Sequence, residues 1–151
     1  MDFILLKWSE MTDEKQITKE FIELLENLEP LKWNTKVKNK TIKEIVAHLV
    51  GWEKEAVKRL DEVWKTKEKP WFLKTENFDE FNKKSMKYYK DYSPEELIKE
   101  WKHWQRLLDK KIKEIGEDKL RTESELFDWV FDEGENNHYL EHLNQTKEIL
   151  R

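Results

Sequence analysis

The sequence contains no cysteine, only three glycines and three prolines, and no apolar run of transmembrane length. The absence of cysteine excludes disulfides, thiolate metal ligands and cysteine nucleophiles. With so few glycines and prolines, the chain has few of the residues that form tight turns and end short strands, and this composition favours long helices. The apolar run after Met1 is too short for a signal peptide and follows no basic region. We therefore expect a soluble, cytoplasmic protein that does not bind membranes.

The charges also exclude a class of partner. The chain has 29 basic and 33 acidic residues with a net charge of -4, and the two signs are interspersed. Nothing in this pattern builds the basic face that phosphate neutralisation needs, so we expect no nucleic-acid binding. Eight tryptophans, seven phenylalanines and four tyrosines supply the large apolar area that disordered chains lack. A length of 151 residues suits a single domain, residues 1–151, with one core.

The spacing of apolar residues predicts four long helices. The first is expected at about 12–28, before Pro30, and the second from the capping-box sequence at Thr41 to about residue 64. The third begins after Ser93 and ends before Gly116, and the fourth follows Gly134 to the C-terminus.

Between these helices the pattern is looser. We expect a loop at 31–40 that contains Trp33, a shorter helix at 77–89, and a turn or short helix at 126–131. No strand-like alternating run occurs. The sequence therefore predicts an all-α fold, a four-helix bundle.

His138 and His142 stand four residues apart on the expected last helix, where this spacing directs both imidazoles towards one point. His48 lies on or beside the buried stripe of the second helix and is the third candidate ligand. A structural role for His48 and a solvated surface role for the pair are the simpler alternatives. His103 lies outside the apolar stripe of the third helix, which its neighbouring tryptophans help to form, so we expect it at the surface.

Three neutral imidazoles on facing helices would hold a divalent transition metal and leave coordination positions open. Such a donor set suits zinc, nickel, copper or iron and disfavours calcium and magnesium. Four glutamates lie near the histidines in sequence and are candidates for contacts to the ligands, but none receives a catalytic assignment: Glu44, Glu53, Glu135 and Glu141. Trp52 and Trp129 could wall a pocket, although packing in the core is the simpler role.

The residues 41–49 (TIKEIVAHL), Trp52-Glu53 and 138–143 (HYLEHL) resemble the DinB/YfiT-like superfamily of bacterial four-helix bundles. The resemblance covers nearly the whole chain in helix order and spacing. It implies a metal-binding triad of His48, His138 and His142. It also implies thiol-dependent transferase, isomerase or hydrolase activity on a small molecule.

Residues 78–97 also resemble the related ClbS/DfsB-type bundles, some of which protect their hosts against reactive metabolites. That branch does not depend on the histidine triad. Two functions therefore stay open: a metal-dependent enzyme of hydrolase or thiol-transferase type, and a metal-free small-molecule-binding or self-protection protein. In both cases we expect a small-molecule partner, and a homodimer is compatible with either.

Overall fold

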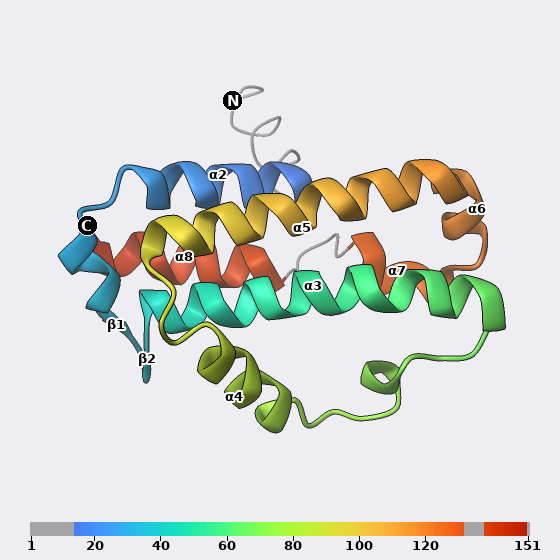
Figure 1. Ribbon diagram of the computed structural model, residues 1–151, viewed down its shortest axis with the longest axis horizontal. Helices are drawn as coiled ribbons and strands as arrows, with labels where there is room; N and C mark the ends of the chain where they lie inside the picture. Colours follow the sequence, from blue (N-terminus) through green and yellow to red (C-terminus); the bar gives the residue numbers. More distant parts are fainter. Residues whose placement is uncertain (1–13, 132–137, 151) are drawn as a thin grey trace. The chain divides into compact units, whose positions relative to one another are not determined.

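Helices form 80% of the residues that the computed structural model describes, which are 14–131 and 138–150. Side chains are described within 16–131 and 139–150. The α-helices are α2 (Glu14–Glu26), α3 (Ile42–Thr66), α4 (Asp79–Tyr88), α5 (Pro94–Ile115), α6 (Glu117–Thr122), α7 (Ser124–Phe131) and α8 (His138–Leu150) (Figure 1). Two short 3-10 helices, η1 (Pro30–Asn34) and η2 (Trp71–Leu73), complete the helical part. The predicted all-α class is confirmed, and none of the described helices is long and apolar enough to cross a membrane.

Capping boxes form at the starts of two long helices, at Thr41 as predicted and also at Ser93. At the start of α5, the Ser93 hydroxyl accepts from the Glu96 backbone N–H at 3.1 Å, and the Glu96 carboxylate accepts from the Ser93 N–H at 3.0 Å. Thr41 and Glu44 make the same reciprocal pair before α3, at 3.0 and 3.1 Å. Each pair satisfies backbone donors that have no partner within the helix, which explains why both helices begin where the sequence predicts.

The connections differ from the expectation in three places. Residues 31–40 form no simple loop: η1 buries Trp33, and strand β1 (Lys36–Val37) pairs antiparallel with β2 (Lys40–Thr41). The helix α6 was not predicted, because its short polar sequence carries no apolar stripe. The first helix ends at Glu26 rather than near residue 28, and the Asn27 side-chain amide donates to the Glu23 carbonyl oxygen of its last turn at 2.8 Å. Its expected start at residue 12 lies outside the described residues.

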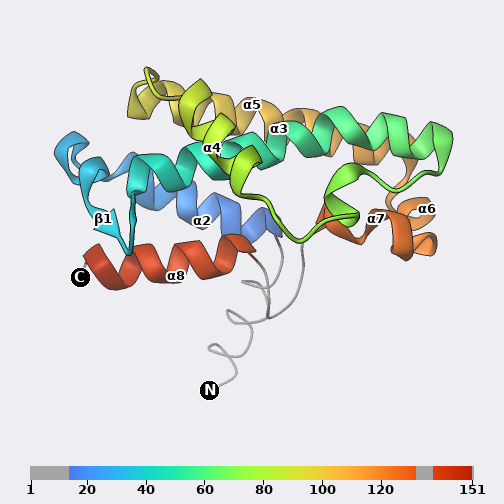
Figure 2. The same ribbon diagram turned by 90° about the horizontal axis from the view of Figure 1, so that it is seen from below.

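Contacts divide the chain into two compact units: Met1–Ile45 with Phe131–Arg151, and Val46–Val130. In the first unit α2 and α8 lie side by side, and β1 also contacts α8 (Figure 2). Glu20 and Lys147 form an ion pair between these two helices. The described core of this unit comes mainly from buried apolar residues of α2 and α8, including Phe21, Leu25 and Leu143.

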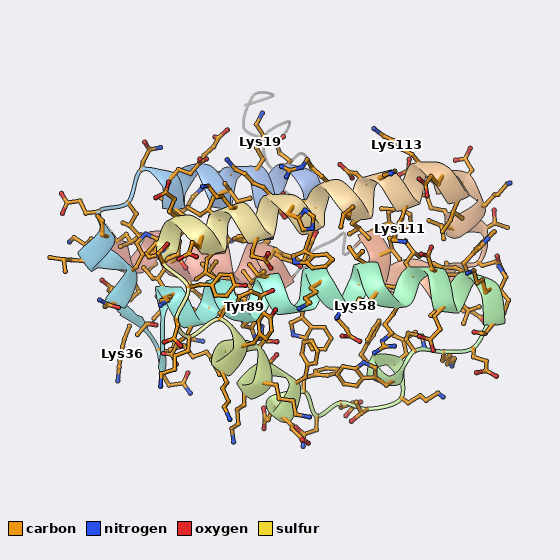
Figure 3. All side chains as sticks on the ribbon, viewed as in Figure 1. Lys19, Lys36, Lys58, Tyr89, Lys111 and Lys113 are labelled. Atoms are coloured by element: carbon orange, nitrogen blue, oxygen red, sulfur yellow. The ribbon has the colours of Figure 1, made fainter. Side chains whose placement is uncertain are left out.

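The second unit contains α4, α5, α6 and most of α3 and α7. The helices α3 and α5 are joined by an ion pair between Asp61 and Lys111. Lys111 is labelled in Figure 3. Towards the end of α3, the Trp64 ring packs on Phe127 of α7, with centroids 5.7 Å apart. The single domain predicted from the sequence spans both units and stays a prediction.

Candidate functional site

His48 lies in the most deeply buried part of α3. Every residue from Ile45 to Gly51 is buried, and His48 exposes 6% of its surface. Its Nδ1 atom is inaccessible to solvent. The predicted position of His48 on the buried side of this helix is therefore confirmed. A buried imidazole suits both a metal ligand and a structural histidine.

His138 and His142 are both residues of α8, so the helical spacing predicted for the pair is confirmed. The His142 side chain is half-buried, and its Nδ1 atom is inaccessible to solvent. The Thr146 hydroxyl donates to the backbone carbonyl oxygen of His142 at 2.7 Å. The His138 side chain lies outside the described residues.

The metal triad stays a prediction. His48 belongs to the unit Val46–Val130, whereas His138 and His142 belong to the other unit. Among the side chains of 16–131 and 139–150, no three histidine, aspartate or glutamate residues form a group that could hold a metal ion. His103 is exposed, with its ring 5.0 Å from the Trp104 ring, so its predicted surface position is confirmed.

Burial separates the candidate glutamates. Glu53 exposes only 2% of its surface, five residues after His48 on α3. Glu44 is occupied by the helix cap, and Glu141 is exposed and accepts from Gln145 at 3.3 Å. Glu135 lies outside the described residues. Among the three glutamates of this set that the structure describes, Glu53 is therefore the buried one, which the sequence analysis did not distinguish among 33 acidic residues.

A second candidate site is an open cleft between α3 and α4, with a volume of about 200 Å³. Its lining includes three lysines, two tyrosines and a serine; Lys58 and Tyr89 are labelled in Figure 3. The nine lining residues are Gly51, Lys54, Glu55, Lys58, Phe81, Lys84, Ser85, Tyr88 and Tyr89. All of them belong to the unit Val46–Val130, and this cleft was not anticipated from the sequence.

The approach of α4 to α3 depends on Gly51. A Cβ atom built on Gly51 would lie 2.2 Å from the Ser85 hydroxyl oxygen and 2.6 Å from the Ser85 Cβ. Both separations are far shorter than a van der Waals contact. Ser85 can therefore pack against α3 at this level because residue 51 has no side chain.

Aromatic side chains pack beside the cleft and join η2 and α4 to α3. Trp52 stacks on Trp71 at 5.7 Å between centroids and contacts Phe81 at 4.2 Å. The Trp52 indole N–H donates to Asn82 at 2.8 Å. Trp129 meets Phe72 edge-on at 4.9 Å. Trp52 and Trp129 thus belong to packed aromatic pairs and are not among the residues that line the cleft.

Tyr89 of the cleft lining and Trp104 of α5 share one hydrogen-bond acceptor, the carboxylate of Glu100. The Tyr89 hydroxyl donates to Glu100 Oε2 at 3.0 Å, and the Trp104 indole N–H donates to the same oxygen at 2.9 Å. Burial, followed by the hydrogen bond to Glu100, raises the pKa of Tyr89 well above the ordinary value. The phenol is therefore held in its neutral, donating form.

The raised pKa of Tyr89, caused first by burial and then by the hydrogen bond to Glu100, predicts a pH dependence of stability. In the unfolded chain Tyr89 loses its proton near pH 10, whereas in the folded protein it keeps it. Above about pH 10 the unfolded state binds fewer protons, so the free energy of unfolding should fall as the pH rises. Tyr89→Phe should reduce this fall, as measured by urea unfolding between about pH 8 and 11.

The matched control is Tyr92→Phe, because burial and the charge of Glu100 also raise the pKa of Tyr92, but its hydroxyl makes no hydrogen bond to Glu100. Its effect should be smaller than that of Tyr89→Phe. If the free energy of unfolding changed with pH in the same way for the parent and for Tyr89→Phe, Tyr89 would ionise alike in the folded and unfolded states, which would contradict this prediction.

Comparison with known proteins places the chain in a family. The model of the DinB superfamily matches residues 15–145, which include His48, His138 and His142 as well as the α3/α4 cleft. No curated protein and no solved structure matches the chain. The match covers α3 and α5 completely and most of α2 and α8, so it reaches into both compact units. The chain therefore belongs to the DinB superfamily.

Proposed function

We propose that this protein is a metal-dependent enzyme that acts on a small molecule, with His48, His138 and His142 as the metal ligands. The observation that carries the proposal is the histidine pair on α8, which has the i, i+4 spacing on an actual helix. The burial of His48 on α3 and the match to the DinB superfamily support it.

The donor set fits a divalent transition metal such as zinc, nickel or iron. Three histidines supply neutral nitrogen ligands and leave at least one position for water or substrate. A bound metal would lower the pKa of a water or thiol and so supply a nucleophile at neutral pH, as a hydrolase or thiol transferase requires. The Nδ1 atoms of His48 and His142 are both buried, so bulk water does not reach these two nitrogens.

Metal analysis of the purified full chain, after reconstitution with zinc, nickel or iron, tests this function. We expect about one metal ion per chain, because three imidazoles define one site. His48→Gln, His138→Ala and His142→Ala should each lose stoichiometric metal. His103→Ala is the matched control and should keep it, since His103 is exposed on α5. Circular dichroism must show each variant folded.

A metal-free small-molecule-binding protein of the ClbS/DfsB type is the second candidate. The observation that favours it is the α3/α4 cleft, because Phe81, Ser85, Tyr88 and Tyr89 lie within the stretch 78–97 that carries this resemblance. Equal metal content in all four variants, or no metal in the reconstituted parent, would reject the metalloenzyme proposal. This second function would then be the accepted one. In either case we expect a cytoplasmic protein.

A further inference from the structure

We propose that the cleft between α3 and α4 binds a small organic anion, with a carboxylate or phosphate group at Lys54 and Lys58 and an apolar part against Phe81 and Tyr88. Lysine ammonium groups recognise either kind of anion. The inference is independent of the histidine motifs, because all nine lining residues lie within Val46–Val130 and none is a histidine.

Two lysines of the lining have uncompensated charges. Within the described part of the chain, neither Lys54 nor Lys58 has a carboxylate within ion-pairing distance. Lys84 is 3.3 Å from Glu80, but this pair lies at the surface with most of each side chain exposed. A surface pair of this kind contributes little, so Lys84 can also turn to a ligand.

The acidic lining residue is already occupied. Glu55 Oε1 accepts from Arg59 Nε at 2.6 Å and from the Trp71 indole N–H at 3.1 Å. The pKa of Arg59 is raised by its hydrogen bonds to Glu55 and Glu62, in keeping with a stable guanidinium–carboxylate contact. Glu55 therefore has a cationic partner of its own and does not neutralise Lys54 or Lys58.

The apolar surface next to the lysines suits an organic anion rather than a bare ion. The Lys54 ammonium lies 4.2 Å from the centre of the Tyr88 ring and 5.8 Å from that of Trp104, which holds the charge at the cleft. Phe81 adds a second ring, and Ser85 a hydroxyl donor. Tyr88 is 58% exposed, so its ring is accessible to a ligand.

The size of the cleft limits the ligand. A volume of about 200 Å³ is below the range of roughly 300–1,000 Å³ that is typical of sites for drug-sized ligands. The occupant should accordingly be a molecule with one ring or a short chain and one anionic group. Its affinity should be modest, with a Kd on the order of 1 mM, because few atoms make contact.

Calorimetric titration of the full chain tests the proposal with three probes. Benzoate and phenyl phosphate separate a carboxylate from a phosphate site, and benzyl alcohol is the neutral control. We expect one anion, or both, to bind more tightly than benzyl alcohol and to bind more weakly at high salt. Loss of a charged contact by Lys54→Gln or Lys58→Gln should weaken binding about tenfold.

Lys113→Gln is the matched control, because Lys113 is an exposed lysine of α5 outside the lining and is labelled in Figure 3. It should bind the anions as the parent does. The proposal is overturned if neither anion binds, if benzyl alcohol binds as tightly, or if all three lysine variants weaken binding equally. Added zinc should leave the affinity unchanged, which separates this site from the histidine ligands.

Discussion

Gly51→Ala is expected to lower the free energy of unfolding by about 1–3 kcal/mol, the usual cost of forcing extra volume into a packed contact. In an ordinary helix the same change should stabilise the protein, because alanine has the higher helix propensity. At this position the new methyl group would meet the Ser85 side chain at 2.2 and 2.6 Å. Helix α4 would have to move away from α3, and the cleft between them would change with it.

A second substitution tests this explanation. Ser85→Gly removes both of the atoms that the new methyl group meets, and the next atom, the Ser85 Cα, is 3.8 Å away. In urea unfolding, the double variant should therefore lose less stability than the two single variants together. Ser85→Ala should give no comparable rescue, because it keeps the Cβ. Additive losses for Gly51→Ala and Ser85→Gly would show that the contact is not the cause.

Trp101→Ala should have the largest effect on stability, a loss of about 3–5 kcal/mol. Trp101 is fully buried on α5, so its removal leaves a cavity that the surrounding helices fill only in part. Urea or thermal unfolding followed by circular dichroism measures the loss, and a fraction of unfolded chain at ambient temperature is an expected result.

Trp104→Ala provides the comparison, since the two tryptophans are three residues apart on the same helix. Trp104 is only half-buried, and its main described partner is the carboxylate of Glu100. The loss should be about 1–2 kcal/mol, the cost of one charge-assisted hydrogen bond and partial burial. Similar losses for Trp101→Ala and Trp104→Ala would argue against the depth of burial as the deciding factor.

Much of the helical structure could be predicted because its signals are local. The cap at Ser93 and Glu96, and the end of α5 before Gly116, depend on residues within one or two turns of each other. The same holds for the placement of His138 and His142 on one helix and of His48 on a buried face. The hairpin at 36–41 was missed because two-residue strands are too short to show alternation.

The candidate sites required more than local signals. The histidine spacing singles out two candidate ligands on α8, but whether His48 meets this pair is a long-range property that local sequence signals do not determine. Glu53 resembles any other glutamate in the sequence, and only its 2% exposure distinguishes it. Its spacing carries a signal all the same, because Glu53 stands four residues from both Leu49 and Val57, which are buried on α3.

The sequence by itself determined that this is an all-α protein, where its long helices lie, and which three histidines are the candidate ligands. The tertiary structure decided that Ser85 packs against Gly51, 34 positions away in the chain, and that Lys54 and Lys58 border a cleft. The physical reason is the separation along the chain of the residues that interact. Caps and helical stripes act between residues three or four positions apart, whereas a cleft depends on the fit between side chains of different helices.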